Sequence, residues 1–316
     1  MSIATANARA ADSRTLRWRM ILAFAVIYVV WGSTYLAIRY AVQTIPPFLM
    51  MGLRHLTAGA VVFAYFAWRG EPWPTRRMWA TAFLSAVFLF IGGHGVLAWA
   101  EQYVPSGPAA LLISTEPLVM VVAARVLGQE KQISLRTVLG LFAGMAGVGL
   151  LFGTPGLENK LATAAVLLSA LMWAVGAIYS RDKTGNSVMM FAAIQMLAGG
   201  TLLLTTGFFR GERLQFSSIS LASAVSLAYL IVFGSILAFT AYMWLLQVTT
   251  AARVGTHAYV NPVVAVALGW LIAREPLSWR ILAGAAVIVG SVLLVNRSDG
   301  EGKKTLTQQR EGVAAD

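Results

Sequence analysis

The chain contains no cysteine, which excludes a disulfide bond, a thiol nucleophile and a thiolate metal site. Aspartate is nearly as scarce, and none of it falls in a long apolar segment. The aspartates are Asp12, Asp182, Asp299 and Asp316. Paired aspartates that would hold magnesium on a diphosphate substrate are therefore missing from the apolar segments. The GxSxG, HExxH and GxxxxGK[ST] motifs are also absent, which removes the signatures of serine hydrolases, zinc proteases and P-loop enzymes.

Charged residues of either sign are few. Only 12% of the 316 residues are charged, 58% are hydrophobic, and the mean hydropathy is +0.71. A soluble chain carries about twice this share of charged residues. The apolar runs are continuous, whereas the spans of a β-barrel alternate apolar and polar residues. The composition therefore predicts an all-α integral membrane protein with about ten spans of about 20 residues each.

Ten apolar segments match this expectation. They cover residues 20–39, 47–68, 78–100, 106–126, 135–153, 161–180, 187–209, 220–244, 251–272 and 279–296. Residues 1–19 and 297–316 remain as polar tails. Arginines precede the first segment as they do in a signal peptide. The segment is too long for a signal peptide and lacks a small-residue cleavage site, so it is predicted to be the first span.

The net charge of +11 fits two different classes of protein. A strongly basic chain can bind nucleic acid, or it can carry the excess of lysine and arginine that marks cytoplasmic loops. Apart from Arg54, the 24 lysine and arginine residues lie in tails, loops or span ends, and most fall on the side that holds both termini. We therefore expect both termini in the cytoplasm, the lipid bilayer as a partner, and no nucleic acid.

The sequence repeats itself after nearly half its length. Trp-Arg-Gly-Glu at 68–71 recurs as Phe-Arg-Gly-Glu at 209–212, and Glu-Pro-Leu-Val at 116–119 recurs as Asn-Pro-Val-Val at 261–264. The two copies cover residues 20–153 and 161–296, with five predicted spans each. Because an odd number of spans reverses the next copy in the membrane, the fold is predicted to be two inverted five-helix repeats. Such repeats are typical of transporters that bind their substrate between the halves.

Three further stretches carry a resemblance to a known family. They are Trp-Gly-Ser-Thr-Tyr at 31–35, Val-Pro-Ser-Gly-Pro-Ala-Ala at 104–110, and Ala-Tyr-Val-Asn-Pro-Val-Val-Ala-Val at 258–266. Over roughly residues 20–296 the chain resembles the EamA branch of the drug/metabolite transporter superfamily. The resemblance implies a ten-helix carrier of the bacterial inner membrane with a cavity lined by spans 1, 3, 4, 6, 8 and 9. Members export amino acids, their relatives or assorted amphipathic compounds.

Ionisable residues distinguish the two copies. Each one within the apolar part of the first copy has a neutral counterpart in the second, as the following pairs show. They are Arg54 and Gln195, His55 and Met196, His94 and Phe239, Glu101 and Leu246, and Glu116 and Asn261. Because the second copy folds with neutral residues at these positions, we infer that the charges serve something beyond folding.

Glu116 is the candidate for proton coupling as well as for substrate binding. It lies roughly 15 Å into the fourth span at about 1.5 Å per residue, which is near the middle of the bilayer. An acid at this depth usually faces a cavity or a partner, and the alternative is a protonated or paired structural acid. Pro117 and Pro262 each remove a helical hydrogen bond, which predicts a kink or break where backbone groups become available.

Arg54 and His94 are further candidates in the first copy. Arg54 is predicted to anchor a substrate carboxylate, and the alternative is that it pairs with an acid or extends toward the membrane surface. His94 lies between glycines and is placed among the substrate-binding residues, and the alternative is a hydrogen-bonded packing histidine. His257 opens the ninth span and is a weaker candidate.

Aromatic and neutral polar residues complete the predicted site. Trp31 and Trp173 lie around mid-span, where they can stack on aromatic or cationic substrates or simply pack in the core. The remaining predicted substrate-binding residues are Ser33, Tyr35, Trp99, Tyr242, Tyr259 and Asn261.

These observations predict a secondary or facilitative transporter that exports amino acids or related compounds by alternating access. Efflux of amphipathic or cationic drugs is the alternative within the same class. From other classes, an integral membrane enzyme acting on a lipid and a channel remain. No catalytic residue, metal site or cofactor is expected, and the partners are a small substrate and protons.

A GxxxG pattern at 140–144 indicates either a dimer contact or packing against the last span within a monomer, and we expect a monomer.

Overall fold

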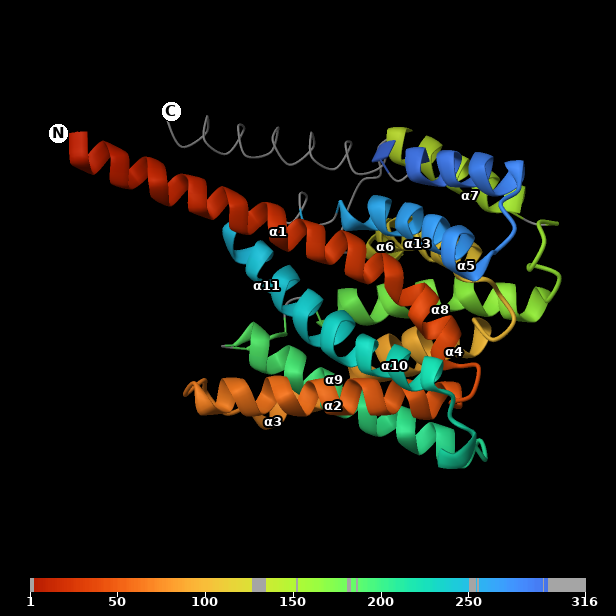
Figure 1. Cartoon of the computed structure of the whole chain (residues 1–316), viewed down its shortest axis with the longest axis horizontal. Helices are drawn as coiled ribbons and strands as arrows, with labels where there is room; N and C mark the ends of the chain where they lie inside the picture. The colour runs from red at the N-terminus through yellow and green to blue at the C-terminus, as the bar shows by residue number, and fades with distance from the viewer. Residues whose placement is uncertain are drawn as a thin grey trace.

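The structure, a computed structural model, describes residues 3–126, 135–151, 153–180, 183–185, 187–249, 254, 256–291 and 293–294. Within these ranges every regular element is a helix (Figure 1). Six helices are long and apolar enough to cross a membrane, and shorter apolar helices cover Val138–Leu151, Val260–Ala273 and Trp279–Ser291. The prediction of an all-α membrane protein is thus confirmed.

The helical elements fall within the two sequence copies as follows. The first repeat contributes α1 (Ile3–Ala41), α2 (Pro47–Trp68), α3 (Arg76–Ala86), η1 (Val87–Gly95), α4 (Val96–Ala100), α5 (Ser106–Ile113), α6 (Glu116–Val126) and α7 (Leu135–Leu151). The second contributes α8 (Lys160–Ser180), α9 (Val188–Phe209), η2 (Phe216–Ser218), α10 (Leu221–Tyr229), η3 (Leu230–Leu237), α11 (Ala238–Val248), α13 (His257–Ala273) and the helix Trp279–Ser291.

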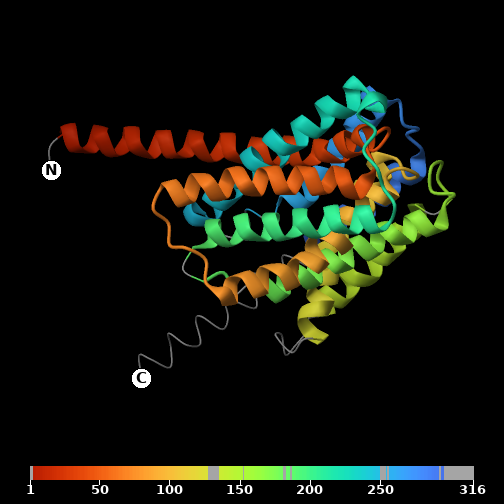
Figure 2. The ribbon, with the colours of Figure 1, turned by 90° about the horizontal axis from the view of Figure 1, so that it is seen from below.

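The first helix is longer than the sequence predicts. Most of the segment 1–19, predicted as a polar tail, is helical because α1 begins at Ile3. This stretch is rich in alanine, the strongest helix former, so the helix continues where the apolar pattern stops. Figures 1 and 2 both show the N-terminal part of α1 extending beyond the rest of the bundle. The predicted tail at 297–316 lies outside the described residues.

The fourth predicted span is divided into two helices, α5 and α6. Ser114 and Thr115 separate them, and their hydroxyl groups donate to main-chain carbonyls three residues back at 2.7 and 2.6 Å. Pro117 then lies in the first turn of α6, where its missing N–H leaves no helical bond unmade. The helix therefore breaks just before Pro117, whereas α13 continues through Pro262.

The third predicted span of each repeat contains a widened, π-helical stretch. η1 follows α3 in the first repeat, and η3 follows α10 in the second. Short π-helical stretches within α-helices occur frequently at functional sites, because the extra residue changes the direction of the side chains and the hydrogen bonding of the carbonyls. Nothing in the apolar pattern of these spans predicts this widening.

α2 and α9, which hold corresponding places in the two repeats, make the most extensive helix–helix contact of the described chain. Glycines on both helices permit it. A Cβ atom added to Gly59 would lie 2.8 Å from the backbone nitrogen of Leu197, and one added to Gly200 would collide with the backbone of Leu56. Membrane helices associate through such small residues because lipid tails compete for apolar contact.

Gly59→Ala should therefore destabilise the purified protein by about 1–3 kcal/mol, the usual cost of overpacking. The added methyl group meets backbone atoms, which cannot rotate away as a side chain could. Gly149→Ala in α7 is the matched control, since nothing lies within 4 Å of its added Cβ. Thermal unfolding in detergent measures both variants, and equal stability of the two would contradict the close contact of α2 and α9.

Candidate functional site

An aromatic cluster lies where α1, α11 and α13 meet. The ring of Trp31 is 5.1 Å from that of Tyr242 and 5.0 Å from that of His257, and the last two rings are 5.9 Å apart. The indole Nε1 of Trp31 donates to the carbonyl of Gly234 at 3.1 Å. Gly234 belongs to η3, so the widened turn supplies the acceptor that orients Trp31.

Polar contacts tie α1 to α13 beside this cluster. Tyr28 and Thr256 share a hydrogen bond of 2.6 Å between their hydroxyl groups. With its amide nitrogen turned toward the main chain, Asn261 donates to the carbonyls of His257 at 3.1 Å and Tyr28 at 3.2 Å. Asn261 is buried, and these bonds make it a link between the first helix and the ninth predicted span.

Glu116 faces the same region from the first turn of α6. It is half-buried, and its carboxylate accepts no hydrogen bond from the described residues. Its charge acts on two tyrosines, Tyr35 of α1 and Tyr242 of α11. The N-terminus of a helix favours a nearby anion. We call Trp31, Tyr35, Glu116, Tyr242 and His257 the central cluster.

Arg54 is buried in α2 and reaches the second repeat. Its Nε donates to the hydroxyl of Ser235 in η3 at 2.8 Å. Its repeat counterpart Gln195 reaches the other way, donating to the hydroxyl of Ser85 at 2.8 Å. Both residues therefore link the repeats, but only Arg54 brings a charge. No carboxylate forms an ion pair with it in the described part of the chain.

His94 belongs to a separate buried group. Its ring stacks on that of His55 at 4.7 Å and 15°, and Phe90 meets both rings edge-on. Both nitrogens of His55 and Nδ1 of His94 are buried without a hydrogen-bond partner among the described residues. The structure thus pairs His94 with His55, a histidine that is not among the predicted site residues.

Three of the other predicted site residues contact residues outside the central cluster. Ser33 shares a 2.6 Å hydrogen bond with the hydroxyl of Tyr229. Trp99 lies beside Tyr103, with ring centres 5.5 Å apart. Trp173 packs against Gly93, where an added Cβ would be 3.2 Å from its ring, which is a packing role. The side chain of Tyr259 lies outside the described residues.

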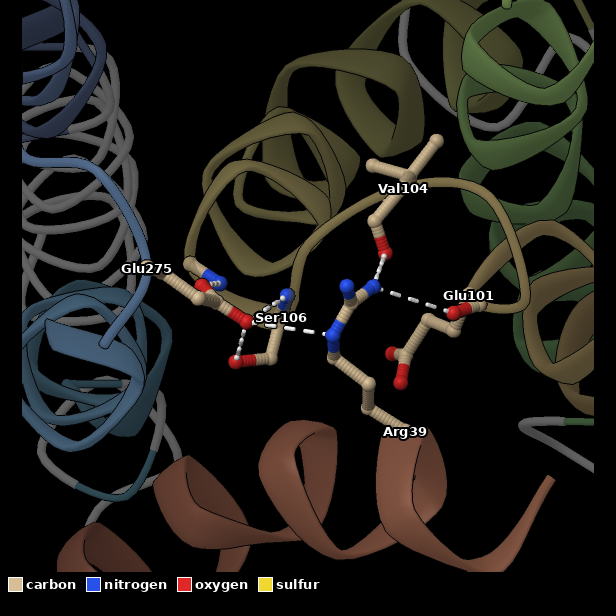
Figure 3. A network of polar contacts seen from close by, with 6 residues as sticks. Arg39, Glu101, Val104, Ser106 and Glu275 are labelled. Atoms are coloured by element: carbon tan, nitrogen blue, oxygen red, sulfur yellow. Dashed lines mark hydrogen bonds and ion pairs between the residues drawn. The ribbon is translucent and has the colours of Figure 1, made fainter. Parts of the chain in front are cut away.

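A polar network of residues outside the predicted site joins the repeats near the end of α1 (Figure 3). One carboxylate oxygen of Glu275 accepts from the backbone N–H and the hydroxyl of Ser106 at 2.7 and 2.8 Å, and the other accepts from the N–H of Gly107 at 3.0 Å. Arg39 pairs with Glu275 at 3.5 Å and donates to the carbonyl of Val104 at 2.9 Å. Glu275 therefore caps α5.

A second acid crosses between the repeats in the same way. Glu212 accepts from the backbone N–H groups of Phe48 at 3.4 Å and Leu49 at 2.9 Å, and so caps α2. In the sequence repeat Glu212 corresponds to Glu71 and Glu275 to Glu130, so both positions hold an acid in each copy. Glu130 lies outside the described residues. The repetition of an acid at corresponding positions could have identified Glu212 and Glu275 from the sequence, but it could not have identified the N–H groups that they cap.

These features define an all-helical membrane protein with an acidic and aromatic cluster between segments of two repeats. The model of the EamA-like transporter family matches residues 18–153 and 160–297, and the chain belongs to this family. The uncharacterized inner membrane transporter YedA of Escherichia coli K12 is 37% identical over 286 residues, covering 89% of this chain and 92% of YedA. The chain is accordingly a membrane transporter rather than an enzyme.

Further comparisons agree. The uncharacterized transporter YvbV of Bacillus subtilis is 28% identical over 287 residues, covering 89% of this chain and 92% of YvbV. PagO of Salmonella typhimurium is 30% identical over 256 residues, covering 78% of this chain and 82% of PagO. A crystal structure with 22% identity aligns over 88% of this chain and 96% of its own with a TM-score of 0.61, which shows a shared fold.

Arg54→Gln, which copies the second repeat, should weaken the binding of anionic and zwitterionic compounds about ten-fold or more, equivalent to about 1.4 kcal/mol. Binding of cations should fall less, because only the positive charge is lost. Ser235→Ala is the control that removes the hydrogen bond and keeps the charge. Fluorescence titration of each purified variant with amino acids and organic cations measures the difference. Equal losses for both classes would assign Arg54 a structural role.

Proposed function

We propose that this transporter exports small metabolites, amino acids or their relatives, from the bacterial cytoplasm by alternating access of two inverted five-helix halves at 20–153 and 161–296. The central cluster carries the proposal. Glu116 and Tyr35 come from the first half, Tyr242 and His257 from the second, and the acid has no partner within the described chain. An unpartnered acid between two halves is where a carrier needs its site.

The ten-span arrangement draws support from the helices. The six long helices, the α5–α6 pair and the three shorter apolar helices would together supply the ten proposed crossings. The excess of lysine and arginine on one side supports cytoplasmic termini. The name of YedA supports the inner membrane as the location.

The carrier is proposed to act as a monomer, with the GxxxG pattern of α7 used within the chain. Gly144 and Gly147 lie against Ser291 and Ile288 of the last helix.

An amino acid fits the two charges near the aromatic residues. Glu116, whose charge acts on Tyr242 beside Trp31, would hold an ammonium group, and the faces of Trp31 and Tyr242 attract a cation. The guanidinium of Arg54 lies next to Gly234, the residue whose carbonyl holds the indole of Trp31, and would take the carboxylate. An acid and a guanidinium near the same aromatic residues favour a zwitterion.

Export of cationic amphipathic compounds is the second candidate. It is favoured by the bond between Arg54 and Ser235, since an Arg54 that stays on Ser235 is not available to a substrate carboxylate, and the acid Glu116 then gives the central cluster its charge. The two candidates differ in whether a substrate carboxylate is required. A methyl ester of a transported amino acid would distinguish them.

Glu116→Gln tests both the site and proton coupling. In proteoliposomes loaded with labelled amino acids, a proton gradient should accelerate transport by the parent protein and leave Glu116→Gln unaffected, because glutamine cannot carry a proton. Glu158→Gln, at an exposed acid in the loop before α8, is the control. The same response to the gradient in Glu116→Gln and in the parent would remove Glu116 as the proton carrier. Absence of saturable transport of any amino acid or organic cation would contradict the proposed function.

A further inference from the structure

Glu101 is the most isolated acid in the described structure. It follows α4 directly, its relative exposure is 0%, and neither carboxylate oxygen has a hydrogen-bond partner among the described residues. Burying an ionised carboxylate without a hydrogen bond or a close ion pair costs several kcal/mol. The environment in this conformation therefore favours the neutral, protonated acid.

Folding does not require an acid at this position. The repeat counterpart of Glu101 is Leu246, so the same place in the second copy is occupied by an apolar residue. Glu101 also contributes no side-chain hydrogen bond to the described structure. An acid that is buried, unpaired and dispensable to the scaffold indicates a function that depends on its proton.

The groups that face Glu101 are few and charged. Arg39 and Tyr35 approach from α1, Arg54 from α2, and Glu275 from the turn after α13, and each interacts with the charge of Glu101. α8 also packs against α4, but its Lys160 is at its exposed first residue and its Tyr179 is near its far end. η1, which leads into α4, carries His94, whose nearest partner is His55.

Arg39 touches both acids of this network but pairs with only one. Its Nε is 3.5 Å from the carboxylate of Glu275, while one of its terminal nitrogens donates to the backbone carbonyl of Glu101 at 3.4 Å. Figure 3 shows the side chain of Glu101 beside that of Arg39, with no bond between the two. Rotation of the Arg39 side chain would exchange Glu275 for the carboxylate of Glu101.

We propose that Glu101 is a proton-binding site that controls the contact between the halves near the end of α1. With the proton bound, Arg39 stays on Glu275 and Val104, and Glu275 caps α5. When the proton leaves for the external solution, the carboxylate of Glu101 draws Arg39 away and repels Glu275. The cap on α5 is then weakened and the two halves separate at this end.

This site shares Tyr35 with the central cluster, because the charge of Glu101 acts on that residue, but it does not depend on which substrate is carried. It rests on the proposed alternating access only for its consequence, because separation at this end would open the central cluster to the outside. Acid outside the cell would keep the outer end closed, and a more alkaline outside would allow it to open.

Hydrogen exchange at the first turn of α5 reports the state of the cap directly. The N–H groups of Ser106 and Gly107 are the ones that Glu275 holds. The first turn of α2 is an internal reference, because Glu212 caps it with no unpaired buried acid beside it. Dividing the exchange rate of the α5 turn by that of the α2 turn removes the intrinsic effect of pH on exchange.

In the full chain in lipid nanodiscs, the exchange ratio of the α5 turn to the α2 turn should rise about five-fold or more between about pH 5 and about pH 9. A factor of about five is the lower end of ordinary coupling between two sites. Glu101→Gln should hold the ratio at its low value throughout, because glutamine mimics the protonated acid. Glu101→Leu, which copies the second repeat, should do the same and serves if the glutamine variant folds poorly. Arg39→Gln should also abolish the rise, since no cation remains to change partner.

Glu158→Gln is the control, and it should retain the rise of the parent protein. The exposed carboxylate of Glu158 accepts from the N–H of Gly156 at 3.0 and 2.9 Å, which lowers the pKa of Glu158, so it stays ionised across the tested range. A flat ratio in the parent, or an undiminished rise in Glu101→Gln and Glu101→Leu, would overturn the proposal. A normal rise without transport of any tested compound would overturn only the proposed function.

Discussion

Backbone N–H and C=O groups inside a membrane must find partners within the protein, and the rest of this structure follows from that constraint. It makes each regular element of the described residues a helix, and it demands a substitute hydrogen-bond partner wherever a helix is broken or ends in an apolar place. Ser114 and Thr115 supply that substitute at the break before α6. Glu212 and Glu275 supply it at the starts of α2 and α5, and because both acids come from the second half, they hold the halves together.

The same constraint explains why the functional candidates gather at irregular backbone. η3 widens the eighth predicted span, and there Gly234 accepts a hydrogen bond from Trp31 and Ser235 accepts one from Arg54. Glu116 occupies the first turn after a helix break. Regular helix has no spare polar groups, so a site for a polar substrate forms where the regular pattern is interrupted. The two repeats share the widened turn and differ in the charges around it.

Much of the fold was predictable because the length of an apolar segment in the sequence directly indicates the length of a membrane span. α2 covers Pro47–Trp68, the segment predicted from its apolar residues alone. The helix breaks just before Pro117, as predicted, whereas α13 continues through Pro262, so a proline alone does not decide where a span breaks. α1 was predicted too short, since its alanine-rich beginning is helical without being apolar. Of the predicted site residues, Trp31 and Tyr242 meet in the central cluster, whereas His94 and Trp173 lie in packing contacts elsewhere.

The sequence by itself determined the membrane class, most of the spans, the internal repeat and the positions at which the repeats differ in charge. These are properties of composition and of residues close together in the chain. Only the tertiary structure decided that Arg39 pairs with Glu275, that Glu101 is left without a partner beside them, and that His55 stacks on His94. Partners of this kind are distant in the chain, and their distances depend on how the helices pack, which no local pattern of residues encodes.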